Sequence, residues 1–329
     1  MSEIALEEIV AARERIAATI HPTPVVPSEA LSAKCGVPVY LKLEHQQRTG
    51  SFKLRGATNA VLSLTEEERA RGVVGVSTGN HGRGLAHAAR QNGIRCIICM
   101  SQLVPQNKID GIRAQGAEVR IIGHSQDDAQ VEVDRLVAEE GMTMIPPFDH
   151  ADIIAGQGTL GLEIAEALPD LKLALVQVSG GGLISGVAMA LKARIPGIRV
   201  VGVSMERGAV MYECQKAGKP IFVEELTTLA DSLGGGIGLD NTYTFEMTYA
   251  LVDDIILVSE AEIAQAIRHA YWHENQIVEG SGSVAMAALL SGRIRPDDPT
   301  LVLVSGCNID MALHHRIISG EDVDVTQQE

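Results

Sequence analysis

Apolar runs of strand length alternate with segments of helical periodicity along most of the chain. The strands are predicted at 39–43, 73–76, 96–100, 118–122, 173–178, 200–203 and 301–304. The helices are predicted at 7–18, 57–64, 82–92, 105–115, 127–140, 158–168, 186–194, 260–275 and 283–290. Strands that alternate with helices are typical of α/β proteins built on parallel sheets, and we expect that fold class here.

Length, net charge and the pattern of apolar residues exclude several classes of protein. The chain has 329 residues, which exceeds the usual size of one hydrophobic core and predicts two domains. Its net charge of −15 argues against a nucleic-acid partner. The N-terminal residues lack the basic and apolar regions of a signal peptide, and no window is long enough to cross a bilayer. We therefore expect a cytoplasmic protein that binds neither nucleic acid nor membrane.

The five cysteines are expected to be free thiols, because the sequence carries no sign of export. Cys96 and Cys99 form a C-x-x-C pattern inside an apolar run that is predicted to be a buried strand. The sequence contains no second pair to complete a zinc site, so packing is the preferred interpretation.

One lysine stands at a turn where a helix is about to begin. Residues 51–56 (SFKLRG) follow a predicted turn at 48–50 and precede the helical composition of 57–64. Lys53 is therefore predicted in the first helical turn. A lysine amine is a nucleophile when burial or a nearby cation lowers its pKa, and its main covalent use is Schiff-base chemistry with carbonyl compounds such as pyridoxal phosphate. Taken alone, the motif favours a solvated surface lysine.

A triple glycine follows the predicted strand at 173–178. Residues 179–183 (SGGGL) lead into a helical run of small residues, so the loop amides can face one anion. The nucleotide P-loop pattern and the dinucleotide fingerprint are both absent from this segment. The loop is a candidate phosphate cradle, and a glycine-rich turn without a ligand stays open as the alternative.

Five short motifs carry a family resemblance. They are 51–53 (SFK), 77–81 (STGNH), 155–159 (AGQGT), 179–182 (SGGG) and 305–308 (SGCN). In order and spacing they resemble the threonine dehydratase and serine racemase group of fold type II pyridoxal-phosphate enzymes. Within that group, 205–208 (MERG) and 231–238 (DSLGGGIG) are similar to the dehydratases associated with hydroxyectoine breakdown.

The resemblance implies a fold type II architecture like that of the tryptophan synthase β subunit, with two three-layer open-sheet domains. Residues 1–71 and 149–320 would form the larger, cofactor-binding domain, and residues 72–148 a smaller inserted domain. The cofactor would lie in the cleft between them, consistent with ligand binding at the carboxyl ends of strands in α/β sheets. The polar, acidic residues 321–329 are expected to form a disordered tail.

The resemblance also implies which residues contact pyridoxal phosphate. Lys53 would hold the aldehyde with Phe52 beside it, and Asn80 would contact the phenolic oxygen. Ser305 would face the ring nitrogen. Glu279 precedes 280–283 (GSGS), where it either borders the ring or places a negative charge at the N-terminus of a helix. The phosphate would bind Ser179, Gly180, Gly181, Gly182 and Leu183. Because a neutral serine hydroxyl does not stabilise a fully protonated pyridinium, the ring is a weaker electron sink, which favours β-elimination.

The turn at 77–81 is expected to bind the substrate. It connects a predicted strand to a predicted helix, so its amides point where an α-carboxylate can dock, although an ordinary capping turn is the alternative. Its members are Ser77, Thr78, Gly79, Asn80 and His81. The resemblance places Thr78 opposite Lys53, where racemases of the group use a serine as a second acid/base. The methyl group and stiff χ1 of threonine disfavour that role.

Two departures from the family pattern affect the site. Serine racemases usually offer carboxylates for a divalent cation where this chain has Ser204 and Val210, so we expect no specific metal there. Cys307 places a thiol near the cofactor, with packing as the preferred explanation.

We therefore predict a pyridoxal-phosphate-dependent dehydratase that converts an L-β-hydroxy-α-amino acid to a 2-oxo acid and ammonia, with Lys53 removing the α-proton. Threonine, serine and a hydroxyectoine-derived 3-hydroxy-2,4-diaminobutyrate all fit this chemistry. The alternatives are a racemase of serine or hydroxyaspartate and, in another class, a non-catalytic amino-acid sensor. The resemblance further implies a homodimer, and the lack of a C-terminal regulatory module predicts a catabolic enzyme.

Overall fold

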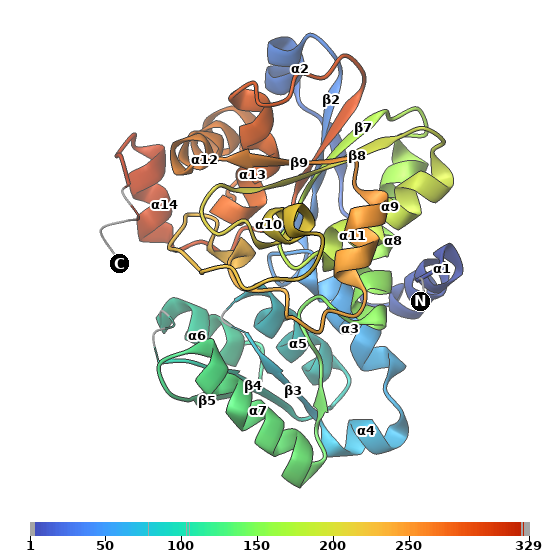
Figure 1. The fold of residues 1–329 in the computed structure, drawn as a ribbon, viewed down its shortest axis with the longest axis vertical. Coiled ribbons are helices and arrows are strands. Elements are labelled where there is room, and N and C mark those ends of the chain that lie inside the picture. Colours follow the sequence, from blue (N-terminus) through green and yellow to red (C-terminus); the bar gives the residue numbers. More distant parts are fainter. Residues whose placement is uncertain (1–3, 78, 103, 105, 324, 326–329) are drawn as a thin grey trace.

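The computed structural model describes residues 4–77, 79–102, 104, 106–323 and 325. These residues form two separate sheets, each flanked by helices, in two lobes (Figure 1). The larger sheet has the strand order β1-β2-β10-β7-β8-β9 and the smaller has the order β5-β4-β3-β6. The strands are β1 (Val25–Pro27), β2 (Val39–Leu43), β3 (Val73–Val76), β4 (Cys96–Met100), β5 (Glu118–Ile121), β6 (Thr143–Met144), β7 (Leu173–Gln177), β8 (Arg199–Met205), β9 (Asp254–Val258) and β10 (Thr300–Val304).

Helices cover both faces of each sheet (Figure 1). They are α1 (Leu6–Ile16), α2 (Glu29–Cys35), α3 (Lys53–Ser63), α4 (Glu66–Arg71), α5 (Asn80–Gln91), α6 (Gln106–Arg113), α7 (Gln126–Glu140), α8 (Ala151–Ala167), α9 (Gly182–Arg194), α10 (Val210–Ala217), α11 (Thr244–Leu251), α12 (Glu260–Glu274), α13 (Gly280–Leu290) and α14 (Met311–Ile318). Two short 3₁₀ helices are η1 (Glu44–Gln46) and η2 (Asp231–Leu233).

The larger sheet separates two hydrophobic cores. Its strands are parallel except for β1, which pairs antiparallel with β2. Successive side chains of a strand point to opposite faces, so Val302 and Val304 enter the core under α12 and α13. Leu301 and Leu303 enter the other core, under α8 and α9. Burial on both faces explains why these strands are continuous apolar runs in the sequence.

The smaller sheet is entirely parallel and also has two buried faces. Cys96 contributes to the core that includes α5 and α6, whereas Cys99 contributes to the core under α7. The two thiols therefore lie on opposite faces of β4 and do not act as a pair, which confirms the packing interpretation of the C-x-x-C pattern. All five cysteines are free.

The predicted α/β class and the seven predicted strands are confirmed, with ends that differ by at most two residues. Three strands were not predicted: β1, β6 and β9. Each lies at the edge of its sheet, and β1 and β6 are only three and two residues long. The unpredicted helices α2, α4, α10, α11 and α14 are likewise short, with six to eight residues each.

The helices α8 and α9 begin seven and four residues earlier than predicted. The predicted starts were residues 158 and 186, whereas α8 begins at Ala151 and α9 at Gly182. The glycines inside these helices are sites of close helix packing. A Cβ atom on Gly186 would lie 2.3 Å from the Ile154 carbonyl oxygen of α8. The backbones of α8 and α9 approach each other at a distance that only glycine permits.

The predicted division into domains corresponds to two sheets in the structure, but the boundaries themselves stay a prediction. Of the predicted tail, Val323 and Val325 are buried against the core of the larger lobe, while 324 and 326–329 lie outside the described residues. No helix in the described part of the chain has the length and apolar character needed to span a membrane.

Candidate active site

The candidate site lies at the carboxyl ends of three parallel strands of the larger sheet. The strands β2, β10 and β7 are neighbours in the sheet, so the segments that follow them meet at one edge. After β2 the chain reaches Lys53, and the Phe52 amide donates a hydrogen bond to the Ser305 carbonyl that follows β10, at 3.1 Å. Ser51 also forms an antiparallel bridge with Gly306. The lysine motif and the serine motif are thus held side by side.

Lys53 is the first residue of α3, as predicted. Its Nζ atom donates a hydrogen bond to the Pro147 carbonyl oxygen at 2.7 Å and lies 5.3 Å from the centre of the Phe52 ring. Burial lowers the pKa of this amine from 10.5 to about 8. A neutral, nucleophilic amine is therefore substantially populated near neutral pH.

The glycine loop leads directly into α9. Gly181 is the residue before the helix and has φ of 87°, in the left-handed region that favours glycine. A Cβ atom there would also lie 2.9 Å from Met211 and from Thr248. Among the described residues no side chain caps α9, so the N–H groups of its first turn are free to bind an anion.

Residues 147 and 148 contact both the Lys53 amine and the glycine loop. Pro147 accepts the hydrogen bond of Lys53, and the next residue, Phe148, packs against the loop. A Cβ atom on Gly180 would lie 2.4 Å from the Phe148 ring, and one on Gly182 would lie 2.8 Å from the Phe148 carbonyl oxygen. The absence of side chains at these glycines therefore lets the loop approach Phe148 and, next to it, Lys53.

A chain of side-chain amides and charges connects α5 to the larger lobe, and we call it the amide relay. Arg83 Nη1 donates to Asn308 Oδ1 at 2.9 Å, and Asn308 Nδ2 donates to Asn80 Oδ1 at 2.5 Å. Asn80 Nδ2 in turn donates to Glu279 Oε1 at 2.6 Å. The relay fixes the orientation of the Asn80 amide, which keeps one N–H for a further acceptor.

Glu279 ends the relay in a buried position. Burial raises the pKa of its carboxyl group to about 7, and the charge of Asp231 acts in the same direction, while the hydrogen bond from Asn80 opposes them. Gly306 makes room for this carboxyl group, because a Cβ atom there would lie 2.2 Å from Glu279 Oε1. The carboxyl group is thus able to gain or lose a proton near neutral pH.

Ser77, in the turn before α5, has a structural role. Ser77 Oγ accepts hydrogen bonds from the amides of Gly79, at 3.2 Å, and Gly82, at 2.9 Å, so it caps the helix. His81 Nε2 contacts the Ile145 carbonyl at 2.8 Å, which requires the proton on Nε2. Burial and the charge of Lys53 lower the pKa of His81 to about 3, so the ring is neutral. Thr78 lies outside the described residues.

Residues 16–306 match the family model described as pyridoxal-phosphate dependent enzyme. The chain belongs to this family. It is 58% identical over 97% of both chains to a Sinorhizobium fredii protein that carries a provisional threonine dehydratase assignment. It is 40% identical to an L-threonine ammonia-lyase of Thermotoga maritima, over 96% of this chain and 78% of the relative. The structure of maize serine racemase superimposes with a TM-score of 0.90 at 33% identity, covering 96% and 97% of the two chains.

These comparisons confirm the predicted fold type II class, the threonine dehydratase and serine racemase group, and pyridoxal phosphate as the cofactor. They also confirm that the protein is an enzyme of the ammonia-lyase class, which argues against a non-catalytic sensor. The resemblance to hydroxyectoine-associated dehydratases is not tested by them and stays a prediction.

The structure also places Ser179, Leu183, Ser305 and Cys307 of this pyridoxal-phosphate-dependent enzyme. Ser179 Oγ donates to the Leu233 carbonyl oxygen at 2.7 Å, and Leu183 and Ser305 are buried. The Cys307 thiol contacts the His45 carbonyl oxygen at 3.4 Å, and burial raises its pKa to about 11. Such a thiol stays protonated and unreactive, which supports its interpretation as a packing residue.

No group of three or more His, Cys, Asp or Glu side chains able to hold a metal occurs in the part of the chain that the structure describes. At the loop after β8, Glu206 forms an ion pair with Arg293 at 2.8 Å, on the surface. The expectation that this enzyme has no specific metal at that loop stays a prediction.

The sequence did not reveal several residues that shape the site of this enzyme. Arg83 follows the STGNH motif by two positions, but nothing in the sequence pairs it with Asn308, more than two hundred residues later. Pro147 and Phe148 belong to no predicted element, and their contacts with Lys53 and the glycine loop depend on tertiary structure. Two consecutive prolines before Phe148 were the only local sign of an ordered connection.

Proposed function

We propose that this enzyme is a dehydratase that acts on an L-β-hydroxy-α-amino acid and releases a 2-oxo acid and ammonia. The observation that carries the proposal is the position of the Lys53 amine. Its pKa is lowered to about 8, and the segment that it contacts also packs against the glycine loop before an uncapped helix. An amine and an anion site at adjacent positions suit a molecule that carries both an aldehyde and a phosphate.

The residues of the site fit pyridoxal phosphate. Lys53 would hold the aldehyde beside Phe52, and the free N–H of Asn80 would donate to the phenolic oxygen. Ser305, after β10, would face the ring nitrogen. The first turn of α9 and the loop before it would bind the phosphate through Ser179, Gly180, Gly181, Gly182 and Leu183. Ser179 would have to turn its hydroxyl away from Leu233 to donate to the phosphate.

When bound, pyridoxal phosphate supplies an electron sink that stabilises negative charge on the substrate Cα. Lys53 would remove the α-proton, and its lowered pKa prepares it for that role. With a pKa of about 8, roughly a quarter of the amine is neutral at pH 7.5, compared with about 0.1% for a pKa of 10.5. The buried position thus increases the supply of the basic form by two orders of magnitude.

The substrate carboxylate would bind at the start of α5, where the backbone amides of Asn80 and His81 and the positive end of the helix dipole favour an anion. The Gly79 amide would have to leave Ser77 Oγ to join them. His81 supports this arrangement as a neutral group, because its pKa of about 3 keeps it uncharged. Ser77 supports it indirectly by capping the helix. Recognition at this position therefore relies on hydrogen bonds and the helix dipole.

The residue that faces the ring nitrogen favours loss of a β-substituent. A neutral serine hydroxyl at Ser305 does not stabilise a fully protonated ring nitrogen, so charge on Cα is stabilised less strongly and is discharged by release of the β-hydroxyl. Among substrates, threonine is supported by the names of the L-threonine ammonia-lyases that this chain resembles. Serine and 3-hydroxy-2,4-diaminobutyrate carry the same β-hydroxy-α-amino group and belong to the proposal.

The test replaces Lys53 by Ala and uses Lys34→Ala, an exposed lysine of α2, as the matched control. We expect Lys53→Ala to abolish both the visible absorption band of the bound cofactor and the release of 2-oxo acid and ammonia. The control should retain both. Normal turnover by the Lys53→Ala variant would refute the assignment of this lysine.

Racemisation of serine or hydroxyaspartate is the second candidate, favoured by the structural similarity to maize serine racemase. It needs an acid/base on the face opposite Lys53, for which Thr78 is the candidate. A Thr78→Ala variant should lose racemisation while dehydration persists. Equal loss of both activities would mean that Thr78 serves the dehydratase itself.

The organisation of the whole protein is also part of the proposal. We propose a larger cofactor-binding domain of residues 1–71 and 149–320 and a smaller domain of residues 72–148. The family resemblance supports a homodimer, and the free state of all five cysteines supports a cytoplasmic location.

A further inference from the structure

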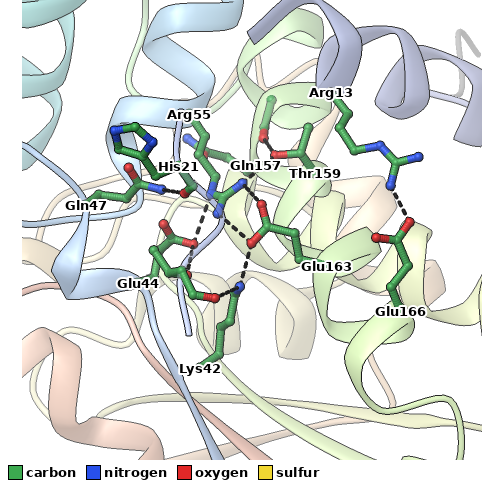
Figure 2. A network of polar contacts seen from close by, with 12 residues as sticks. Arg13, His21, Lys42, Glu44, Gln47, Arg55, Gln157, Thr159, Glu163 and Glu166 are labelled. Atoms are coloured by element: carbon green, nitrogen blue, oxygen red, sulfur yellow. Dashed lines mark hydrogen bonds and ion pairs between the residues drawn. The ribbon is translucent and has the colours of Figure 1, made fainter. Parts of the chain in front are cut away.

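A network of buried ion pairs lies behind the first turn of α3. Arg55 Nε donates to Glu44 Oε2 at 2.9 Å, and its two Nη atoms donate to Glu163 at 2.6 and 2.9 Å. Lys42 Nζ donates to Glu163 Oε2 at 2.5 Å. Figure 2 shows Arg55 at the centre of these contacts, between Glu44 and Glu163. We call these four residues the anchor network.

The anchor network is charge-balanced and almost completely removed from water. Lys42 and Arg55 are 1% exposed and Glu44 is not exposed. Burial alone would lower the pKa of Arg55, but the charges of Glu44 and Glu163 raise it, so the guanidinium remains charged. A buried network of this kind is costly to desolvate, and breaking it leaves an uncompensated charge in the interior. The four side chains therefore have one favourable arrangement.

The network joins three elements around α3. Lys42 belongs to β2, Glu44 to the following 3₁₀ turn, Arg55 to α3, and Glu163 to α8. Lys42 also donates to the Thr23 carbonyl oxygen at 2.7 Å, and Arg55 donates to Thr159 of α8 at 3.1 Å. The first turn of α3 is thereby fixed to the larger sheet and to a neighbouring helix.

Arg55 and Lys53 project from nearly opposite sides of α3. The two residues are two positions apart in the same helical turn, so their side chains project about 200° apart around the helix axis. Arg55 points into the anchor network while Lys53 points to the Pro147 carbonyl oxygen. Phe52, the residue before α3, makes no side-chain capping hydrogen bond. The first turn is held from behind instead, by Arg55 and by the Gly56 amide, which donates to Gln157 Oε1 of α8 at 3.3 Å.

We infer that Arg55, held by Glu44 and Glu163, is a positioning residue that keeps the Lys53 amine directed at the cofactor cleft. This inference rests on the proposed role of Lys53. Arg55 contacts no reacting group itself. It acts by fixing the helical turn from which Lys53 extends, so loss of the network leaves the amine in several orientations and more exposed to water.

A cavity next to the anchor network makes the inference testable by chemical rescue. It has a volume of about 680 Å³ and is lined by Ile16, Ile20 and Val25 together with Lys42, Arg55 and Glu163. Such a cavity can admit a guanidinium ion to the space that Arg55→Ala would leave. Its rim carries a second ion pair, Arg13 with Glu166, in which the side chains are 39% and 64% exposed. Glu166→Gln is therefore a matched control at the same cavity.

The experiment measures how fast an amine-acetylating reagent modifies Lys53 as a function of pH, by mass spectrometry of the full-length protein after reversible removal of the cofactor. In the wild type we expect a midpoint near pH 8. In Arg55→Ala the midpoint should rise by about one pH unit toward the ordinary lysine value. Guanidinium chloride should return it toward pH 8. The dissociation constant of pyridoxal phosphate should rise roughly tenfold in parallel and recover with guanidinium.

Glu163→Gln provides a second variant if Arg55→Ala does not fold, since it removes one charge but keeps most of the volume. The control Glu166→Gln should match the wild type. A wild-type labelling midpoint in folded Arg55→Ala or Glu163→Gln would overturn the inference and leave the network a purely structural feature. If the wild type bound no pyridoxal phosphate, the proposed function would fail, whereas the labelling midpoints would still decide the role of Arg55.

Discussion

At the residue scale, the chemistry of the site comes from burying a few ionisable groups in particular surroundings. Lys53 and Glu279 both have pKa values moved toward neutrality, downward for the amine and upward for the carboxyl group. In both cases burial is the largest cause, because a charged group loses its hydration. Two groups that change protonation near pH 7 therefore flank the position proposed for the cofactor.

The raised pKa of Glu279 predicts a specific dependence of stability on pH. Its folded-state pKa is about 7, compared with 4.5 for an unperturbed glutamate, so between these values the folded state binds more protons than the unfolded state. The free energy of unfolding should therefore fall as pH rises from about 4.5 to about 7, by about 3 kcal/mol from this group. Denaturant unfolding of the cofactor-free protein at both pH values measures the effect.

Glu279→Gln is the variant for that measurement, because it keeps an acceptor for Asn80 but does not ionise. Its unfolding free energy should change less between the two pH values than that of the wild type. Glu321→Gln, an exposed carboxylate near the C-terminal end, serves as a control. Identical pH dependence of wild type and Glu279→Gln would show that Glu279 ionises normally.

At the scale of elements, helix starts and close helix contacts position the reactive groups. The helices α3, α5 and α9 each begin at a residue of a site motif: Lys53, Asn80 and Gly182. The sequence predicted these motifs and the strands before them, because turn residues and apolar runs are local signals. It misplaced the starts of α8 and α9, because glycines inside a helix are explained only by the helix packed against them.

The close contact between α8 and α9 predicts that one added methyl group at Gly186 lowers the stability of the protein. In Gly186→Ala the new Cβ would meet Ile154 O at 2.3 Å and Gly158 N at 2.7 Å, both backbone atoms that have little freedom to move. We expect a loss of about 1–3 kcal/mol in unfolding free energy as α8 and α9 separate. Gly236→Ala is the control, since the nearest atom to its Cβ is 4.0 Å away. Equal stability of the two variants would mean that α8 and α9 adjust without cost.

A second prediction concerns the residue before α9. In Gly181→Ala the φ of 87° and contacts of 2.9 Å to three side-chain atoms both oppose the native loop conformation. The affinity for pyridoxal phosphate should fall by roughly 5-fold to 150-fold, corresponding to about 1–3 kcal/mol of backbone strain. Equilibrium titration with the cofactor measures it, and unchanged affinity would remove this loop from the proposed phosphate site.

At the scale of the whole molecule, the site depends on contacts between the two lobes. Asn80 and Arg83 come from α5 beside the smaller sheet, whereas Glu279 and Asn308 come from the larger lobe. Sequence motifs indicated Asn80, Glu279 and the 305–308 segment as separate members of a site. Their connection through one amide relay was not predictable, because it depends on how the lobes are placed.

The relay predicts that Asn308 contributes to cofactor binding without contacting the reacting atoms. Asn308→Ala removes the donor to Asn80 and the acceptor for Arg83, so the Asn80 amide is held by its bond to Glu279 alone. Cofactor affinity should fall by about tenfold, equivalent to one hydrogen bond of about 1–1.5 kcal/mol. Asn92→Ala, at the far end of α5, is the matched control and should bind normally. Wild-type affinity in Asn308→Ala would show that the relay does not orient Asn80.

The most direct test of the account is an absorbance titration of the purified protein with pyridoxal phosphate, followed by addition of threonine, serine and 3-hydroxy-2,4-diaminobutyrate in turn. We predict a visible band that requires Lys53, that shifts on addition of at least one of these amino acids, and that is accompanied by stoichiometric 2-oxo acid and ammonia. A band with inversion of the substrate but no 2-oxo acid would favour racemisation. The absence of any band after cofactor addition would contradict the central claim that Lys53 holds pyridoxal phosphate.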